Sequence, residues 1–349
     1  MKKLLASVLA TAFILSMAGC GGASSQAPKS SAESTAPVAA TAPSAEKIVV
    51  KIGHVEAEDR STHRALLELE KELEGKNPKF DIQIFPNGVL GGDVQLSESA
   101  SLGTIQIALP STSVLTMYSE EFGVLDMPFL FNSAESAFAA LDGDLGKKLD
   151  ADLAGVGVVN LGYTYNGPRC MTNSKHPINE PADLAGMKMR VMESPVFITL
   201  FETLGANATP MSFSELFTGL QQKTVDAQEN PPSLIYASRF QEVQKYLSLS
   251  NHVHNCLAVL VNEKFYNGLS AEDKAVFDEC IKNFVANQRA MELKDNNEYI
   301  EKLRQDGMEV NDISPENHQK FVTALAPMYD QYKEKFGQPL FDLALKYNK

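Results

Sequence analysis

The chain of 349 residues is long enough for two domains, and with 44% hydrophobic and 21% charged residues it has the composition of a globular protein. Its formal net charge of −13 at pH 7 argues against nucleic-acid binding, which needs a basic surface. The charge does not exclude an anionic ligand, because the potential inside a closed cleft depends more on local arginines than on net charge.

The N-terminus has the pattern of a bacterial lipoprotein signal over residues 1–19. Lys2 and Lys3 form a basic start, and the apolar stretch Leu4–Met17 that follows is too short for a comfortable membrane span. Cleavage before Cys20 and acylation of this residue would anchor the chain stably. Two acyl chains give stable membrane attachment, whereas a single chain binds only marginally. We therefore expect an extracytoplasmic protein, lipid-anchored to the bacterial cell membrane on its periplasmic or outer face. An ordinary signal peptide with a chance cysteine is the alternative.

Residues 20–46 are mostly Ser, Ala, Pro and Thr and show no apolar periodicity, which predicts a flexible tether. The folded part is expected to begin at Lys47 with a strand over 48–52. Alternating apolar residues predict a second strand over 80–84, and helical spacing predicts a helix over 62–74. The elements that follow are helices over 93–102, 133–141 and 144–153 and strands over 104–108 and 156–161. This alternation is typical of an α/β domain.

The stretch from Gly186 to Pro231 predicts two amphipathic helices. Apolar residues recur at helical spacing over 197–204 and again over 213–220. Ser194 is expected to cap the first helix, and Ser212 to open a capping box at the second. Short strands are expected before, between and after these helices, which implies a mostly parallel sheet covered by helices.

Arg190 is the unusual residue of this stretch. It lies in an apolar run at the carboxyl end of a predicted strand over 187–192, and ligands bind outside such strand ends in open α/β sheets. A buried guanidinium is costly without a partner, which leaves two interpretations. One is a structural salt bridge to Glu193 or Asp226. The other is an anion receptor, because the planar fork of Arg matches a carboxylate in two hydrogen bonds.

The same stretch resembles the signature of the TRAP-transporter solute-binding proteins, the DctP-type family. The resemblance rests on GMKMRV, LGANATPMSFSELFTGLQ and VDAQENP, which are close variants of the family's motifs. Further landmarks are LDMPFLF at 125–131, NGPRCMTNSKHPI at 166–178 and Asn251-His252. The resemblance therefore extends from about Ile48 to the C-terminus.

The resemblance implies a periplasmic-binding-protein-like α/β fold, with two α/β domains, a central ligand cleft and a long helix that spans both domains. Ser270 and Gly307 bracket a candidate for this helix over 271–306. The expected division gives residues 47–166 and 256–295 to domain I, and residues 167–255 and 296–349 to domain II.

By resemblance, Arg190 would bind the ligand carboxylate in a bidentate pair, and Arg169 would be a second carboxylate-binding arginine. Asn230 would hydrogen-bond the ligand and Phe213 would pack on it, although Phe213 is also explained as a core residue of its helix. Four positions that vary within the family would tune specificity: His54, Glu56, Ser111 and Glu193. Glu193 would either accept ligand hydroxyls or pair with Arg190, and His54 is also explained as a surface histidine.

No cofactor and no metal are expected. His252 and His254 share a strand face, but no third ligand stands at a readable spacing, so a structural role is favoured. If Cys20 is acylated, three cysteines remain, too far apart for a metal motif, and we expect buried thiols with a disulfide between two of them left open: Cys170, Cys256 and Cys280.

The sequence thus predicts a monomeric, non-enzymatic solute-binding protein of a TRAP-type secondary transporter. It would close around a small organic carboxylate in the interdomain cleft and deliver it to the small and large membrane permease subunits. A C4-dicarboxylate and a sugar acid such as a uronate or diketogulonate are equally compatible ligands. Two alternatives stay open: a receptor lipoprotein that presents ligand to a sensor kinase or chemoreceptor, and a lipoprotein enzyme, which no G-x-S-x-G or H-E-x-x-H motif supports.

Overall fold

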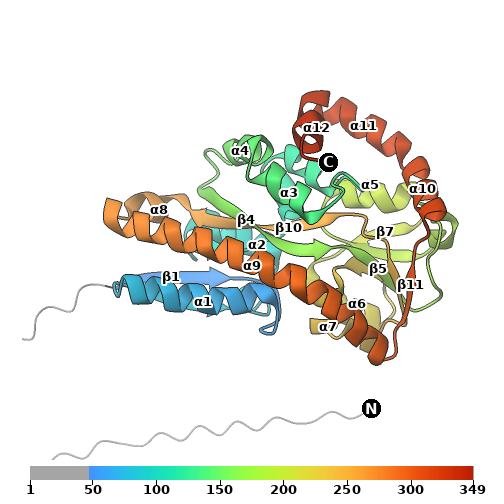
Figure 1. Ribbon diagram of the computed structural model, residues 1–349, viewed down its shortest axis with the longest axis horizontal. Helices are drawn as coiled ribbons and strands as arrows, with labels where there is room; N and C mark the ends of the chain where they lie inside the picture. The colour runs from blue at the N-terminus through green and yellow to red at the C-terminus, as the bar shows by residue number, and fades with distance from the viewer. Residues whose placement is uncertain (1–46, 349) are drawn as a thin grey trace, which may run out of the picture. The chain divides into compact units, whose positions relative to one another are not determined.

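The computed structural model describes residues 47–348, and all structural statements below concern this part of the chain (Figure 1). The predicted signal, the acylation site Cys20 and the tether lie outside the described residues. Among the residues that are described, no helix is both long enough and apolar enough to cross a membrane.

The first sheet has five strands in the order β2-β1-β3-β10-β4. β1 is parallel to β2 and β3, whereas β10 is antiparallel to β3 and β4, so the sheet is mixed. The bounds are β1 Ile48–Gly53, β2 Phe80–Phe85, β3 Ile107–Ala108, β4 Val158–Pro168 and β10 His254–Asn262.

Helices cover both faces of this sheet, as the alternation along β10 shows. Val259 and Val261 belong to one buried apolar cluster with α1 and α9, whereas Ala258 and Leu260 belong to another. The helices on the first face are α1 Ser61–Lys76 and α9 Ala271–Gln305, with α8 Glu263–Gly268 before α9. The second face carries α2 Asp93–Leu102, the 3-10 helices η1 Thr112–Met117 and η2 Glu120–Asp126, α3 Ala134–Leu141 and α4 Asp144–Ala151.

The second sheet has six strands in the order β11-β9-β5-β8-β6-β7. β5 runs antiparallel to its neighbours β8 and β9, while β6 is parallel to β7 and β8. The bounds are β5 Cys170–Asn173, β6 Lys188–Val191, β7 Asn207–Pro210, β8 Ala227–Asn230, β9 Tyr246–Leu249 and β11 Glu309–Asp312.

Helices also cover both faces of the second sheet. Met189 of β6 packs in one apolar cluster with Phe197 and Phe201 of α5, whereas Leu247 of β9 packs in another with Leu216 of α6. The elements around this sheet are η3 Pro181–Leu184, α5 Pro195–Thr203, α6 Phe213–Gln221, α7 Pro232–Ala237 and η4 Phe240–Glu242. These layers give the predicted two-domain, periplasmic-binding-protein-like fold.

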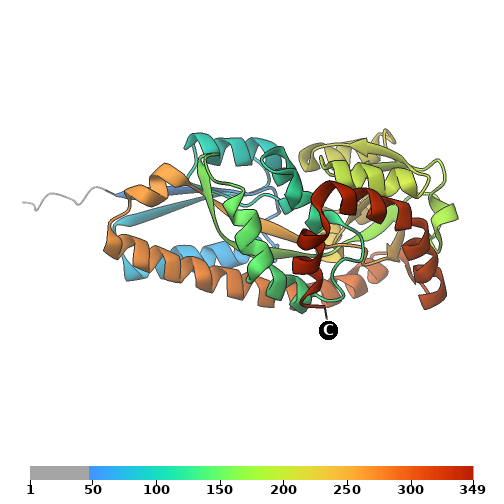
Figure 2. The same ribbon diagram turned by 90° about the horizontal axis from the view of Figure 1, so that it is seen from above.

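The long helix predicted over 271–306 is confirmed as α9. It runs past both sheets, packing on α1 and β4 of the first and contacting α7 and β11 beside the second (Figures 1 and 2). Its 35 residues correspond to roughly 50 Å at 1.5 Å per residue. The hydroxyl of Ser270 accepts a hydrogen bond from the Asp273 backbone N–H at 3.1 Å and so caps its N-terminus.

Three helices follow β11 at the C-terminal end of the described residues: α10 Pro315–Ala324, α11 Ala326–Phe336 and α12 Gln338–Leu345. α11 contacts α5 and η2, and α12 contacts α3 and α4. The C-terminal segment therefore touches helices of both sheets, and the residue ranges of the two domains stay a prediction.

Several local expectations were wrong. The side chain of Ser194 does not cap α5, because its hydroxyl donates to Asp126 Oδ2 at 2.7 Å. The capping box of Ser212 does not form either, since this hydroxyl lies 3.0 Å from that of Ser214. The strand expected over 104–108 is reduced to β3, whereas the short strand expected between the two helices of the 186–231 stretch is present as β7. In the first two cases a tertiary or nearby polar partner replaces the local cap.

Candidate functional site

The candidate site lies where the chain passes between the sheets. β4 leads through Arg169 directly into β5, and the returning chain enters β10 at His254, which pairs with Pro168. A cavity of about 30 Å³ lies here. Its lining comes from elements of both sheets: Val55, Glu56, Asp93, Ser111, Asn166, Arg169, Arg190, Met192, Phe213, Asn230, Leu234 and Leu257.

Six of the eight predicted ligand-binding residues line this cavity, and His54 and Glu193 do not. The cavity is narrow in this arrangement of the two sheets, and its lining comes from both of them.

Arg190 lies at the carboxyl end of β6 and is 2% exposed. Its Nε and Nη2 both donate to the Met211 carbonyl oxygen, at 2.9 and 2.6 Å, while Nη1 is buried without a partner. Burial, together with the nearby charge of Arg169, lowers the pKa of Arg190 to about 10. The guanidinium is therefore still charged at neutral pH, and one end of its fork faces no acceptor.

The proposed structural salt bridge of Arg190 does not form among the described residues. Asp226 pairs with Lys175 at 2.7 Å, and Glu193 is exposed without a salt bridge to Arg190. Neither Asp226 nor Glu193 therefore forms the salt bridge that would have made Arg190 a structural residue.

Arg169 is compensated differently. Its Nε bonds Glu229 Oε2, and its Nη2 lies 2.7 Å from Glu229 Oε1, so the two side chains form a bidentate buried pair. Although burial raises it, the charge and hydrogen bonds of Arg169 bring the pKa of Glu229 below its usual value. Nη1 of Arg169 contacts Asn255 Oδ1 at 3.4 Å. Binding of a ligand carboxylate by Arg169 stays a prediction.

Two carboxylates line the opposite wall. Glu56, which follows β1, accepts from Arg60 Nη2 through Oε1 at 3.2 Å, while its buried Oε2 has no partner. Asp93 lies in the first turn of α2 and is half-buried. Its Oδ1 atom is fully buried and has no hydrogen-bond partner. Burial and the charge of Glu56 raise the pKa of Asp93 to about 7, against the opposing effect of Arg190.

Sequence reasoning did not single out Asp93. An acidic residue in the first turn of a helix is common, because it stabilises the helix dipole, and that explanation hid its place in the cavity. The signal that could have raised suspicion is the Gly91-Gly92 loop before it, which brings backbone close to the second sheet's side: a Cβ on Gly92 would lie 2.5 Å from the Ser212 hydroxyl.

The remaining polar lining is held by hydrogen bonds. Asn230 Nδ2 donates to Gln228 Oε1 at 2.6 Å, and Ser111 Oγ accepts from Asn255 Nδ2 at 3.1 Å. Phe213 both lines the cavity and packs on Phe240, with ring centroids 6.0 Å apart. Phe213 therefore lines the cavity and packs on the core at the same time, so the two interpretations of this residue are compatible.

His54 is not a surface histidine, because it is fully buried beside the cavity wall. Its Nε2 lies 3.1 Å from His63 Nδ1, and burial lowers its pKa to about 4. A neutral imidazole of His54 fits this position. The contact of His54 with a ligand stays a prediction.

The three cysteines are free, buried thiols, so no disulfide links them. His252 lies 3.1 Å from Glu229 Oε2, and His254 lies 2.7 Å from the Tyr165 hydroxyl, both in structural contacts. Within residues 47–348, no group of three His, Cys, Asp or Glu side chains is placed to hold a metal ion.

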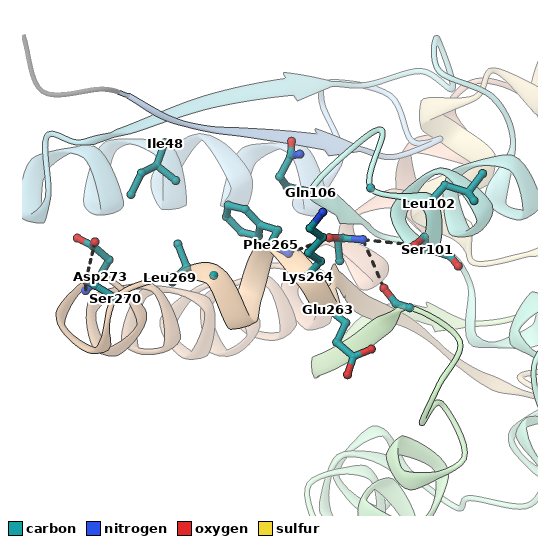
Figure 3. A pocket seen from close by; sticks show the side chains of 14 residues that line it. Ile48, Ser101, Leu102, Gln106, Glu263, Lys264, Phe265, Leu269, Ser270 and Asp273 are labelled. Carbon is teal, nitrogen blue, oxygen red and sulfur yellow. Dashed lines mark hydrogen bonds between the residues drawn. The ribbon is translucent and has the colours of Figure 1, made fainter.

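A wider groove of about 660 Å³ lies away from this cavity, beside the start of β1 and the helices α8 and α9 (Figure 3). It is lined by exposed apolar side chains such as Leu102, which is 80% exposed, and by Phe265. One of its two carboxylates, that of Asp273, already accepts from Asn77 at 2.7 Å and Lys79 at 3.1 Å, and no buried side-chain oxygen of Glu263 is without a partner. The groove therefore lacks the unpartnered buried polar atoms that mark the small cavity.

Comparison with known proteins agrees with this geometry. The family described as bacterial extracellular solute-binding protein, family 7 (DctP), matches residues 52–335. The sugar acid binding protein DctPAm from Advenella mimigardefordensis, solved with galactonate, is 37% identical with a TM-score of 0.84, over 87% of this chain and all of that one. A TRAP periplasmic solute-binding protein from Shewanella oneidensis, solved with succinate, is 29% identical with a TM-score of 0.84 over the same shares. The 2,3-diketo-L-gulonate-binding periplasmic protein YiaO of Escherichia coli is 34% identical, over 75% of this chain and 80% of its own. The chain belongs to family 7 of the bacterial extracellular solute-binding proteins, the DctP-type proteins of TRAP transporters.

Proposed function

We propose that this protein captures a small organic carboxylate between its two sheets, with Arg190 as the receptor for the carboxylate. The observation that carries the proposal is the incomplete pairing of this guanidinium. The Met211 carbonyl occupies the Nε–Nη2 side, so the end formed by Nη1 and Nη2 can present two parallel N–H groups to a carboxylate. Relatives solved with galactonate and succinate support this ligand class.

Binding is coupled to closure in this proposal. The small cavity has one wall from the first sheet and one from the second, and a ligand that contacts both walls stabilises the closed arrangement. The chain crossings at Pro168 and His254 are the natural hinges, because β4 and β10 are the strands that pass between the sheets there. Small-angle scattering with and without ligand should report compaction on saturation.

Family membership supports a role in transport rather than catalysis. We propose that the ligand is handed to TRAP membrane permease subunits and that acylation of Cys20 holds the protein, as a monomer, at the outer face of the cell membrane. Cys20→Ser should release the protein from membranes when fractions are compared. Equal partitioning of mutant and wild type would refute the anchor and leave the binding function intact.

The receptor role of Arg190 is tested by calorimetric titration of Arg190→Ala and Arg190→Lys with the carboxylate that binds best in a thermal-shift screen. Loss of one partner of a buried charge pair costs about 2–5 kcal/mol, so Arg190→Ala should weaken binding roughly 30-fold or more. Lys keeps the charge without the fork and should be intermediate. Arg304→Ala, at the exposed end of α9, is the control. Wild-type affinity in Arg190→Ala would overturn the proposal.

A further inference from the structure

We infer that the cavity selects polyhydroxylated monocarboxylates, the class of aldonates and uronates, over C4-dicarboxylates, and that Glu56 and Asp93 are the residues that impose this choice. The inference rests on the proposed function, because it assumes that Arg190 receives the carboxylate. It assigns to Asp93 a role in ligand specificity.

The first step is the balance of charge around the cavity. Arg169 is neutralised by its bidentate pair with Glu229, which leaves Arg190 as the cation of the lining without a bonded carboxylate. Glu56 shares its partner, because Arg60 also bonds Glu292 at 3.1 Å. One cation without a bonded carboxylate therefore faces two carboxyl groups across the cavity, which gives one ligand carboxylate a receptor and a second ligand carboxylate none.

The second step is the hydrogen-bonding character of the two carboxyl groups. An ionised carboxylate accepts hydrogen bonds and donates none. Glu56 Oε2 and Asp93 Oδ1 are both buried without a partner. A ligand hydroxyl satisfies such an oxygen, whereas a second ligand carboxylate would place like charges at hydrogen-bond distance.

The third step is the placement of these groups on opposite walls. Arg190 belongs to β6 of the second sheet, while Glu56 follows β1 and Asp93 opens α2, both on the first sheet's side. A ligand that bridges the walls would bind through its carboxylate at one end and its hydroxyls at the other. The apolar lining residues Met192 and Leu257 would contact its C–H groups.

The competing possibility is a protonated Asp93 that donates to a second ligand carboxylate. The charged groups that act on Asp93 are Arg190, Glu56 and Glu193, and burial raises its pKa to about 7. Dicarboxylate binding by this route would take up a proton and weaken steeply above pH 7. Binding through hydroxyls needs only an acceptor oxygen, which Asp93 offers in both protonation states, and would not weaken there. The two modes therefore separate by their pH dependence.

The experiment is calorimetric titration at pH 8 with four probes: D-galactonate, D-glucuronate, succinate and L-malate. A site built around hydroxyl groups rejects analogues that leave its buried polar atoms unpaired, so the tighter sugar acid should bind at least 100-fold more tightly than succinate. Glu56→Gln and Asp93→Asn remove the negative charge and should each reduce the ratio of sugar-acid to succinate affinity at least tenfold. Glu98→Gln, on the exposed side of α2, is the matched control and should leave the ratio unchanged.

The outcomes separate this inference from the proposed function. If succinate or malate binds as tightly as either sugar acid at pH 8, or if both variants keep the wild-type ratio, the inference is wrong. If Arg190→Ala still abolishes binding of the probes in that case, Arg190 remains the proposed carboxylate receptor, and only the selectivity for sugar acids is refuted. If none of the four probes binds at millimolar concentration, both proposals fail.

Discussion

Two buried arginines of this protein look alike in the sequence and differ in how the fold compensates their charge. Arg169 is bonded by both oxygens of Glu229, and its guanidinium lies 5.4 Å from the centre of the Phe197 ring. Arg190 is held by one backbone carbonyl, and its Nη1 has no partner. Burial alone therefore does not identify a binding arginine. The partner decides, because an arginine that is already paired has little left for a ligand.

The largest expected effect comes from removing the partner of Arg169. Glu229→Gln leaves a buried guanidinium without its counter-charge, so the free energy of unfolding of the ligand-free protein should fall by about 3–5 kcal/mol. Denaturant titration measures this. Glu309→Gln, which breaks an exposed pair with Lys245, should change the value by less than about 1 kcal/mol. Similar small losses in both variants would remove the distinction between the two arginines.

Asp126 is a buried carboxyl whose partners are neutral, in contrast to Glu229, and this difference predicts a pH dependence of stability. Asp126 accepts from the hydroxyls of Ser113 at 2.6 Å and Ser194 at 2.7 Å, and burial raises its pKa to about 7. The folded state thus holds a proton that the unfolded state has released, so this contribution to stability is lost as pH rises from about 4 to about 7. The slope is at most about 1.4 kcal/mol per pH unit. Asp126→Asn should flatten it in unfolding curves between pH 5 and 8, and an unchanged slope would contradict the assignment.

A smaller effect is expected when Arg190 itself is removed. Arg190→Met exchanges an incompletely paired guanidinium for an apolar side chain, so the ligand-free protein should keep its free energy of unfolding to within about 1 kcal/mol. Arg169→Met should be clearly destabilising, because it leaves Glu229 buried without its cation. Melting of both variants without ligand makes the comparison directly. Equal losses would indicate that Arg190 is structural as well.

The smallest effect is expected at Glu193. This side chain is exposed and lies outside the cavity lining, so Glu193→Gln should change stability by less than about 0.5 kcal/mol. Ligand affinity measured by calorimetry should stay within about twofold of wild type. A larger loss of affinity would indicate that Glu193 contacts the ligand although its side chain is exposed.

The elements that are stabilised by contacts between near neighbours in the chain could be predicted from the sequence. Helical spacing over 213–220 predicted the helix observed as α6, and Ser270 caps α9 as expected. Arg190, Asn230 and Phe213, which lie in the motif, line one cavity, and their contacts with a ligand stay a prediction. Periodicity and caps depend on contacts between residues a few positions apart, which the sequence displays directly.

The compensation of buried charges could not be predicted from the sequence, because it depends on contacts between distant segments. Glu229 pairs with an arginine sixty positions away, and Ser194 turned from its expected cap to Asp126, which lies sixty-eight positions away. Asp93 lines the cavity because the start of α2 lies close to the segment before α6, where a Cβ on Gly92 would be 2.5 Å from the Ser212 hydroxyl. These choices depend on which buried groups meet across distant segments. Inside a low-dielectric interior the nearest partner, rather than the local pattern, sets the free energy of a charge.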